Sequence, residues 1–187
     1  FKNQDSHIEI KGTNILNKII SNNKPVIFVS GHFSNFELIF SNSKEYDLTH
    51  YKNCHELFNK ERPDFVIHLA AYSGGIEANR KYPADFYYIN TLLVANVFKA
   101  ASSFEVKKII YTMGGCSYPA TASSPIDESQ LWSGFPQKES SAYSTAKMMG
   151  IVAAESFMHQ YGLNYTILIP GNMYGEYDNY SLENSHV

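Results

Sequence analysis

The sequence predicts an α/β protein with a Rossmann-like parallel sheet and helices on both of its faces. Short apolar, β-rich runs alternate along the chain with longer helical patterns, which is the order of elements that βαβ units require. Residues 64–69 form a largely apolar run, typical of a parallel strand buried on both faces. With 44% hydrophobic and 18% charged residues, the composition is that of a globular chain rather than a disordered one.

Each element has a local signal. Gly31 closes the first apolar β-rich strand, Pro63 stops one helix, Pro83 begins the next, and Pro170 closes the last strand. Gly74-Gly75 indicates a turn, and residues 114–139 form a Pro- and Ser-rich loop. We expect strands over 7–10, 25–30, 64–69, 107–113 and 164–169, and helices over 13–21, 34–40, 50–60, 83–102 and 142–161.

The predicted sheet is incomplete. Between Gly31 and Asp47 there is no room for the usual second strand of a dinucleotide-binding fold. We therefore expect residues 25–30 in the first-strand position of a sheet that is short of a strand. The chain begins at Phe1 rather than at a methionine and stops at Val187 without a closing helix, so we also expect a piece of a longer product, truncated at both ends.

Charge and composition exclude several classes of function. A formal net charge of -3 without a basic stripe gives no support for nucleic-acid binding. The apolar stretches are shorter than a membrane span needs. The two cysteines, Cys54 and Cys116, indicate no disulfide framework and fit a reducing cytoplasm. We predict no metal site.

Tyr143 and Lys147 stand four residues apart within one predicted helix, which places both side chains on the same helical face. A phenol has a reference pKa of about 10, and a nearby ammonium favours the phenolate. The pair could therefore deliver a proton to an oxygen while a hydride reaches the adjoining carbon. Taken alone, the spacing also occurs by chance on surface helices.

From about residue 42 to 187 the chain resembles the extended short-chain dehydrogenases of the NAD-dependent epimerase/dehydratase family, and within them the GDP-L-fucose synthase group. The likeness is carried by an ordered set of motifs. They are Asp47-Leu-Thr, Pro63-Asp-Phe-Val-Ile-His-Leu-Ala-Ala, Gly74-Gly-Ile-Glu-Ala-Asn, Tyr82-Pro-Ala-Asp-Phe, Asn90, Cys116-Ser-Tyr-Pro, Pro125-Ile-Asp-Glu, Tyr143-Ser-Thr-Ala-Lys, Gln160-Tyr-Gly, Pro170-Gly-Asn-Met-Tyr-Gly, Asp178-Asn and Ser185-His-Val.

The resemblance implies an NADPH-dependent epimerase-reductase that acts on a 4-keto-6-deoxy nucleotide sugar. Tyr143 would protonate the C4 oxygen, Lys147 would hold the nicotinamide ribose, and Cys116 and His186 would be the base and acid that invert C3 and C5. It also implies a homodimer through helices 83–102 and 142–161. The NADP(H) contacts implied are Asp47, Leu48, Leu69, Ala70, Ala71, Thr112, Met113, Gly114, Gly115, Lys147, Pro170, Gly171, Asn172, Met173 and His186.

Other readings of single residues stay open. Cys116 fits a small buried hydrophobe as well as a base, and His186 lies one residue from the end of the chain. His68 lies within a predicted strand and is expected to be a hydrogen-bonded core histidine. We expect Asn90 to brace a neighbouring strand through its amide, and Ser117 not to act as a substrate donor.

Two departures from the family pattern predict impaired activity. Gly114 stands where the family has a serine that hydrogen-bonds the substrate carbonyl, and loss of one such donor costs on the order of 100- to 1000-fold in rate. The glycine-rich phosphate turn after the first strand is also incomplete, because Ser34 and Glu37 replace glycines after Gly31. A carboxylate at Glu37 would repel a pyrophosphate.

Residues 1–41 resemble a segment of the lipid A biosynthesis acyltransferases. His32 and Glu37 fit that family's His-x-x-x-x-acid motif, in which the imidazole deprotonates a sugar hydroxyl. The chain therefore divides into an acyltransferase-like segment, 1–41, packed onto the sheet, and a partial NAD(P)-binding domain, 42–187. Three functions follow: an impaired epimerase-reductase, an acyltransferase fragment, and a non-catalytic fused fragment.

Overall fold

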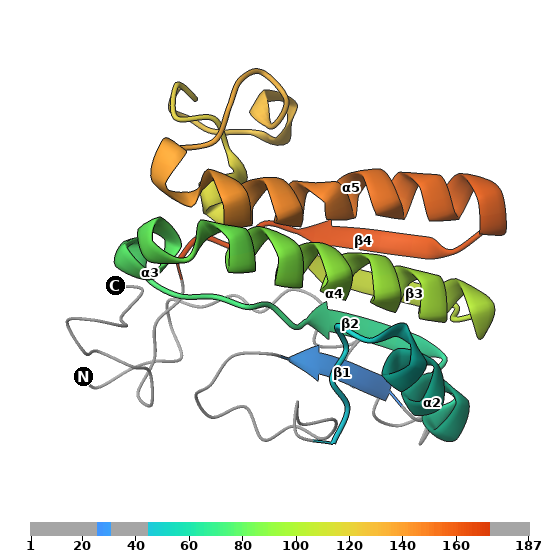
Figure 1. The fold of residues 1–187 in the computed structure, drawn as a ribbon. Coiled ribbons are helices and arrows are strands. Elements are labelled where there is room, and N and C mark those ends of the chain that lie inside the picture. The colour runs from blue at the N-terminus through green and yellow to red at the C-terminus, as the bar shows by residue number, and fades with distance from the viewer. Residues whose placement is uncertain (1–25, 31–44, 173–187) are drawn as a thin grey trace, which may run out of the picture.

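A computed structural model describes residues 26–30 and 45–172 of this 187-residue chain. Figure 1 shows strands and helices alternating along the described part, as expected. The expected strand over 7–10 and the helices over 13–21 and 34–40 lie outside the described residues. The elements in chain order are β1 (Val26–Ser30), α2 (Tyr51–Glu61), β2 (Phe65–Leu69), α3 (Ile76–Lys81), α4 (Pro83–Ser103), β3 (Lys108–Thr112), α5 (Ser141–Tyr161) and β4 (Asn164–Leu168), with one-turn 3₁₀ helices η2 (Gly115–Ser117), η3 (Glu128–Gln130) and η4 (Lys138–Ser140) between β3 and α5.

The four described strands form one parallel sheet in the order β1-β2-β3-β4. Val26 pairs with Phe65, Phe65 with Lys108, and Lys108 with Asn164, so all four strands start level with one another. The predicted strands 25–30, 64–69, 107–113 and 164–169 are confirmed to within a residue or two. Strand β1 pairs with β2 at one edge of the described sheet, and this is the first-strand position that the sequence predicted for residues 25–30.

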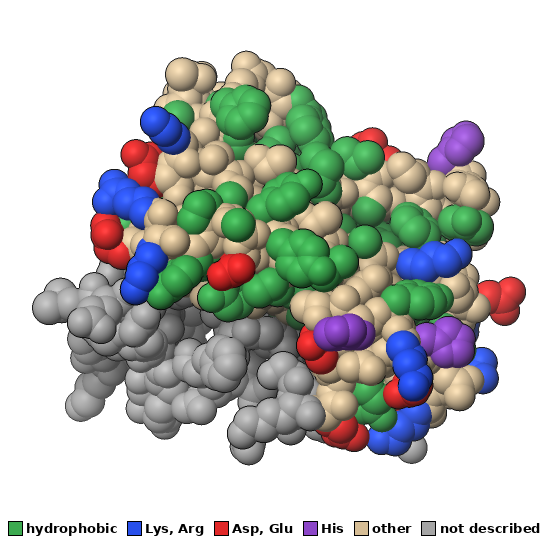
Figure 2. All heavy atoms as spheres, in the orientation of Figure 1, with side chains coloured by type: hydrophobic (Ala, Val, Ile, Leu, Met, Phe, Trp, Pro, Cys, Tyr) green, Lys and Arg blue, Asp and Glu red, His purple; other side chains and the backbone are tan. Residues whose placement is uncertain are grey.

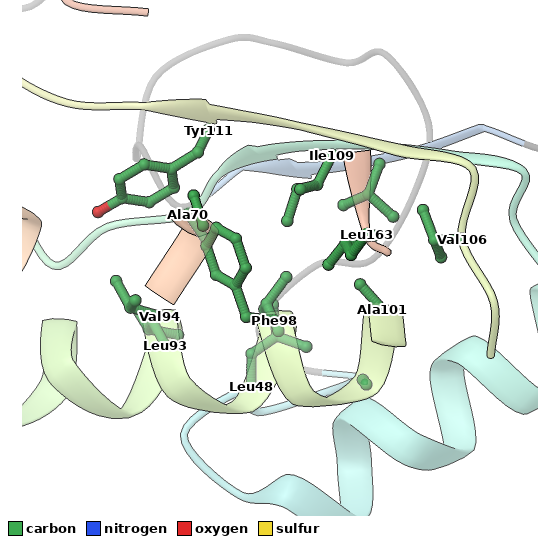
Figure 3. Packing of buried hydrophobic residues seen from close by; sticks show 14 of the residues in the cluster. Leu48, Ala70, Leu93, Val94, Phe98, Ala101, Val106, Ile109, Tyr111 and Leu163 are labelled. Carbon is green, nitrogen blue, oxygen red and sulfur yellow. The ribbon is translucent and has the colours of Figure 1, made fainter. Parts of the chain in front are cut away.

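Helices α4 and α5 pack side by side against the sheet, and α2 packs against α4 (Figure 1). The core lies beneath them. Figure 3 shows Ile109 and Tyr111 of β3 facing Val94 and Phe98 of α4. This face carries the buried residues of β2 and β3, whereas the alternate residues, such as Ile67 and Ile110, are half-buried. The fold is thus the α/β, Rossmann-like parallel arrangement that the sequence predicted, and the helices described here cover one of its two faces.

Helix boundaries follow the local signals. Pro83 begins α4 at its first turn. Gly162 ends α5 with a φ of 71° and donates its N–H to the Met158 carbonyl. The predicted turn at Gly74-Gly75 is followed directly by α3, a six-residue helix that the sequence reading missed. Asn79 of α3 donates to the carbonyls of Gly74 and Gly75 and so holds that turn against the helix.

Candidate active site

The carboxyl ends of β2, β3 and β4 meet at one edge of the sheet. The Met113 N–H donates to the Leu168 carbonyl at 2.8 Å, and the Thr112 hydroxyl donates to the His68 carbonyl at 3.2 Å. Ligands of open parallel sheets bind beyond this edge. The segments that the sequence assigned to cofactor binding, 69–71, 112–115 and 170–172, therefore lie together where a site is expected.

The loop after β3 brings Cys116 against Tyr143. A Cβ added to Gly114 would lie 3.1 Å from the Cys116 Sγ and 3.7 Å from the Tyr143 Cε1. The Ser144 hydroxyl donates to the Cys116 carbonyl at 3.0 Å and so ties the loop to the first turns of α5. Cys116 is solvent-exposed, so it is not the buried small hydrophobe of the alternative reading. Its thiol is open to an incoming ligand.

Lys147 lies one turn further along α5 and points into the protein. Its side chain is 2% exposed, and its Nζ lies 4.6 Å from the centre of the Tyr111 ring. Burial lowers the Lys147 pKa to about 8, although the charge of Cys116 acts in the opposite direction. Within the described residues Lys147 makes no ion pair with a carboxylate. Its ammonium is therefore a buried charge with capacity for a polar ligand.

The Tyr143 phenol behaves differently from the sequence prediction. Lys147 was expected to lower its pKa, but burial, helped by the charge of Cys116, raises the Tyr143 pKa well above its usual value. Lys147 does not lower the Tyr143 pKa as expected, because its ammonium is directed toward the Tyr111 ring on β3. The raised pKa keeps the phenol protonated at neutral pH, as a hydrogen-bond donor rather than a base.

The segment after β2 is held by Asn90. Its amide donates to the carbonyls of Tyr72 and Phe86 and accepts the Tyr72 N–H at 3.0 Å. The bracing role predicted for Asn90 is present, although it acts on the segment after the strand. The Tyr72 and Phe86 rings pack at a tilt of 56° with 4.8 Å between their centres, and Phe86 meets Tyr143 edge-on at 6.2 Å. Asn90 therefore supports Tyr143 through two rings.

The remaining predicted cofactor residues differ in exposure. Ala70, Ala71 and Met113 are buried, Leu69, Thr112, Gly114 and Pro170 are half-buried, and Gly115, Gly171 and Asn172 are exposed. Asp47 accepts hydrogen bonds from Thr49, and the Leu48 side chain is buried in the core, where its carbonyl accepts from Asn96 at 3.0 Å. Met173 and His186 lie outside the described residues, as do His32, Glu37 and the rest of the expected phosphate turn, including Gly31 and Ser34.

Sequence reasoning missed two residues and misjudged a third. Tyr111 and Gly150 were given no role, yet the Tyr111 ring fills the space beside Gly150. His68 is a fully buried core residue as predicted, but neither ring nitrogen makes a hydrogen bond of normal geometry among the described residues. Burial and the Lys147 charge lower its pKa to about 3, opposed weakly by the Leu93 backbone. The one signal that the sequence offered for the Tyr111–Gly150 contact was a glycine inside a helical pattern.

Comparison with known proteins agrees with this geometry. A sequence profile described as the NAD dependent epimerase/dehydratase family matches residues 10–187. The chain is 39% identical over 151 residues to the GDP-L-fucose synthase of Escherichia coli K12, covering 81% of this chain and 47% of that protein. It is 35% identical over 184 residues to GDP-L-fucose synthase 1 of Arabidopsis thaliana, covering 90% and 56%.

Solved structures show the same fold. A GDP-L-fucose synthetase from Naegleria fowleri bound to NADP aligns with a TM-score of 0.76 at 29% identity, covering 88% of this chain and 61% of that one. A GDP-D-glycero-L-gluco-heptose synthase from Campylobacter jejuni, solved in the presence of NADPH, aligns with a TM-score of 0.79 at 28% identity, covering 88% and 52%.

The parallel sheet with its covering helices defines a Rossmann-like fold, and the Tyr-x-x-x-Lys helix and the cysteine loop lie at the carboxyl ends of its strands. Within that class, the chain belongs to the NAD dependent epimerase/dehydratase family. It spans about half the length of the curated relatives it matches. Across residues 26–30 and 45–172, no helix is long and apolar enough to cross a membrane, and no group of His, Cys, Asp and Glu could hold a metal ion.

Proposed function

We propose that this chain carries the cofactor and proton-transfer half of an NADPH-dependent nucleotide-sugar epimerase-reductase of the GDP-L-fucose synthase kind. One observation carries the proposal: the exposed Cys116 thiol and the protonated Tyr143 phenol flank Gly114 at the end of β3. A proton acceptor and a proton donor are therefore within reach of one small ligand. The relatives named above support the nucleotide sugar as the substrate class.

The described residues fit a nicotinamide cofactor. Lys147 offers a buried ammonium without a carboxylate partner among residues 45–172, and a ribose hydroxyl is a suitable acceptor for it. Small residues at the strand ends, Ala70, Ala71 and Gly115, let a dinucleotide approach the backbone. Within the part of the chain that the structure describes, a Cβ at Gly171 would meet no atom within 4 Å. When bound, NADPH supplies the hydride that reduces the C4 ketone.

The chain's own residues would handle the protons. The C4 ketone acidifies the neighbouring C3–H and C5–H bonds, so a Cys116 thiolate can remove each proton while the charge moves to the C4 oxygen. His186, outside the described residues, would return a proton to the opposite face. Tyr143 would donate its phenolic proton to the C4 oxygen at reduction, and its raised pKa keeps that proton available at neutral pH.

Gly114 leaves the C4 oxygen without the hydroxyl donor that the family pattern places there. We therefore propose that the chain's activity is low, by the factor given above for one lost donor. The Ser117 side chain is fully buried, which supports the prediction that it does not replace the missing donor.

The assembly and the division of the chain are also proposals. Exposed apolar residues lie along α4 and α5, among them Tyr88 and Val152, and Figure 2 shows apolar side chains gathered across this face. They support a homodimer through the two helices, which sedimentation of the chain tests.

The free Cys54 and Cys116 fit a cytoplasmic location. Parallel pairing of β1 with β2 supports 1–41 as a segment that contributes a strand to the 42–187 domain.

The test uses GDP-4-keto-6-deoxymannose in deuterated water. Proton exchange at C3 and C5, followed by NMR, should require Cys116 but not Tyr143, because the phenol acts only at reduction. NADPH oxidation should be lost in Tyr143→Phe. Exchange that persists in Cys116→Ser, or oxidation that persists in Tyr143→Phe, would overturn the assignment of these roles.

A further inference from the structure

Tyr111 makes two separate contacts with one residue, Lys147. Its hydroxyl donates to the Lys147 carbonyl at 3.0 Å, and its ring lies 4.6 Å from the Lys147 Nζ. The first contact fixes the backbone of α5 at this position, and the second fixes the far end of the same side chain. Tyr111 is fully buried, and burial raises its own pKa far above the usual value, so its hydroxyl remains a donor at every physiological pH.

The surroundings hold the Tyr111 ring in place. A Cβ at Gly150 would lie within 2.8 Å of three atoms of the ring, so the absence of a side chain there makes the space that the ring fills. Phe98 of α4 meets the ring edge-on at 5.8 Å, and His68 of β2 lies 5.3 Å away, both between ring centres. Figure 3 shows the ring and Phe98 in the same layer between β3 and α4.

We propose that Tyr111 is a positioning residue that holds the Lys147 ammonium, in its charged form, at the place where the cofactor ribose would bind. An aromatic face attracts a cation through its quadrupole, and the attraction is strongest where water is excluded. Lys147 is excluded from water and has no carboxylate partner in the described residues, so the ring helps to compensate its charge, beside the contribution of Cys116. The functional meaning of this clamp rests on the proposed cofactor site.

Four titratable groups lie around Lys147, each from a different part of the fold. They are His68 from β2, Tyr111 from β3, Cys116 from the loop and Tyr143 from α5, whereas α4 contributes the non-titrating Phe98. His68 is neutral above pH of about 3 and Tyr143 is neutral at neutral pH. Of these neutral groups, the Tyr111 ring is therefore the one whose aromatic face attracts the Lys147 ammonium. The charge of Cys116 acts in the same direction.

The experiment follows the NMR shift of the Lys147 Cε nucleus against pH in isotope-labelled protein, with the signal assigned by its loss in Lys147→Arg. The wild-type titration should centre on about 8. Tyr111→Phe keeps the ring and should leave the midpoint within roughly 0.3 of a unit. Tyr111→pentafluorophenylalanine keeps the shape but reverses the quadrupole, and should lower the midpoint by roughly one unit.

Phe58→Leu is the matched control, because it removes another fully buried ring of the core, one whose ring contact is with Phe104 rather than with Tyr111. It should reduce stability without moving the lysine titration. A fluorinated ring with the wild-type midpoint, or an equal shift in Phe58→Leu, would overturn the clamp. The readout needs neither cofactor nor substrate. If the titrations follow this prediction while NADPH fails to bind, the proposed function falls and the clamp stands.

Discussion

Gly150→Ala is expected to destabilise the protein, although alanine is the better helix former. Propensity alone favours alanine in α5 by about 1 kcal/mol. The added methyl would, however, meet three atoms of the buried Tyr111 ring within 2.8 Å, whereas ordinary contacts begin near 3.4 Å. The nearest ring atom would lie at 2.1 Å, so the ring or the helix must move by about 1.3 Å in a packed core, which costs about 3 kcal/mol. The strained Tyr111–Lys147 hydrogen bond adds about 1 kcal/mol.

The net loss expected is about 3 kcal/mol in the free energy of unfolding, measured by urea denaturation. Gly171→Ala is the control, because its new methyl meets no atom of the described residues within 4 Å, and it should change little. In a Tyr111→Leu background the cost of Gly150→Ala should fall by about 2 kcal/mol, since the ring is gone. A Gly150→Ala protein as stable as the wild type, or more so, would refute the packing of Tyr111 against α5.

Three further outcomes can be checked. Asn90→Ala should lower the free energy of unfolding by about 2 kcal/mol, because it removes three hydrogen bonds to the backbone, one buried and two part-buried. Thr91→Val should be neutral or stabilising, because the buried Thr91 hydroxyl has no partner among the described residues. The pKa of His68 is lowered on folding, so the unfolded chain binds the extra proton and stability falls as the pH drops from about 6.5 toward about 3. Between pH of about 7 and 4.5, urea denaturation should show a loss of about 2.5 kcal/mol in the free energy of unfolding. His68→Leu should remove most of this loss. Gly114→Ser should raise NADPH-dependent turnover by on the order of 100-fold, with the exposed Cys116 thiol shifting slightly to admit the new side chain; an unchanged rate would place the lesion elsewhere.

The sheet was predictable because each strand is a short, mostly apolar run, and β1, β3 and β4 are each followed within two residues by glycine or proline. Strand β2 and helix α4 follow their patterns to within a residue or two. The short helix α3 was not predicted, because its six residues are too few to show the helical periodicity of apolar side chains. The site was predictable to the same extent: strand ends of a parallel sheet gather automatically, and the position of Cys116 near Tyr143 follows from that.

What the sequence could not supply is the direction of each side chain. The four-residue spacing of Tyr143 and Lys147 gives a common face, but not that the lysine turns inward to a ring on β3. The Tyr111–Gly150 contact joins residues 39 positions apart, and only packing reveals it. That His68 makes no good hydrogen bond within residues 26–30 and 45–172 likewise depends on its neighbours in β3, α4 and α5 rather than on its own strand.

The central claim is that the strand ends and α5 form a nicotinamide site around Lys147, and fluorescence titration with NADPH tests it most directly. Saturable binding is expected, weakened at least tenfold, or about 1.4 kcal/mol, in Lys147→Met. Lys99→Met, which removes an exposed lysine that lies over the Tyr161 ring on the same helical layer, should bind like the wild type. Binding that fails to saturate at millimolar NADPH, or equal affinities for the two variants, would contradict the account.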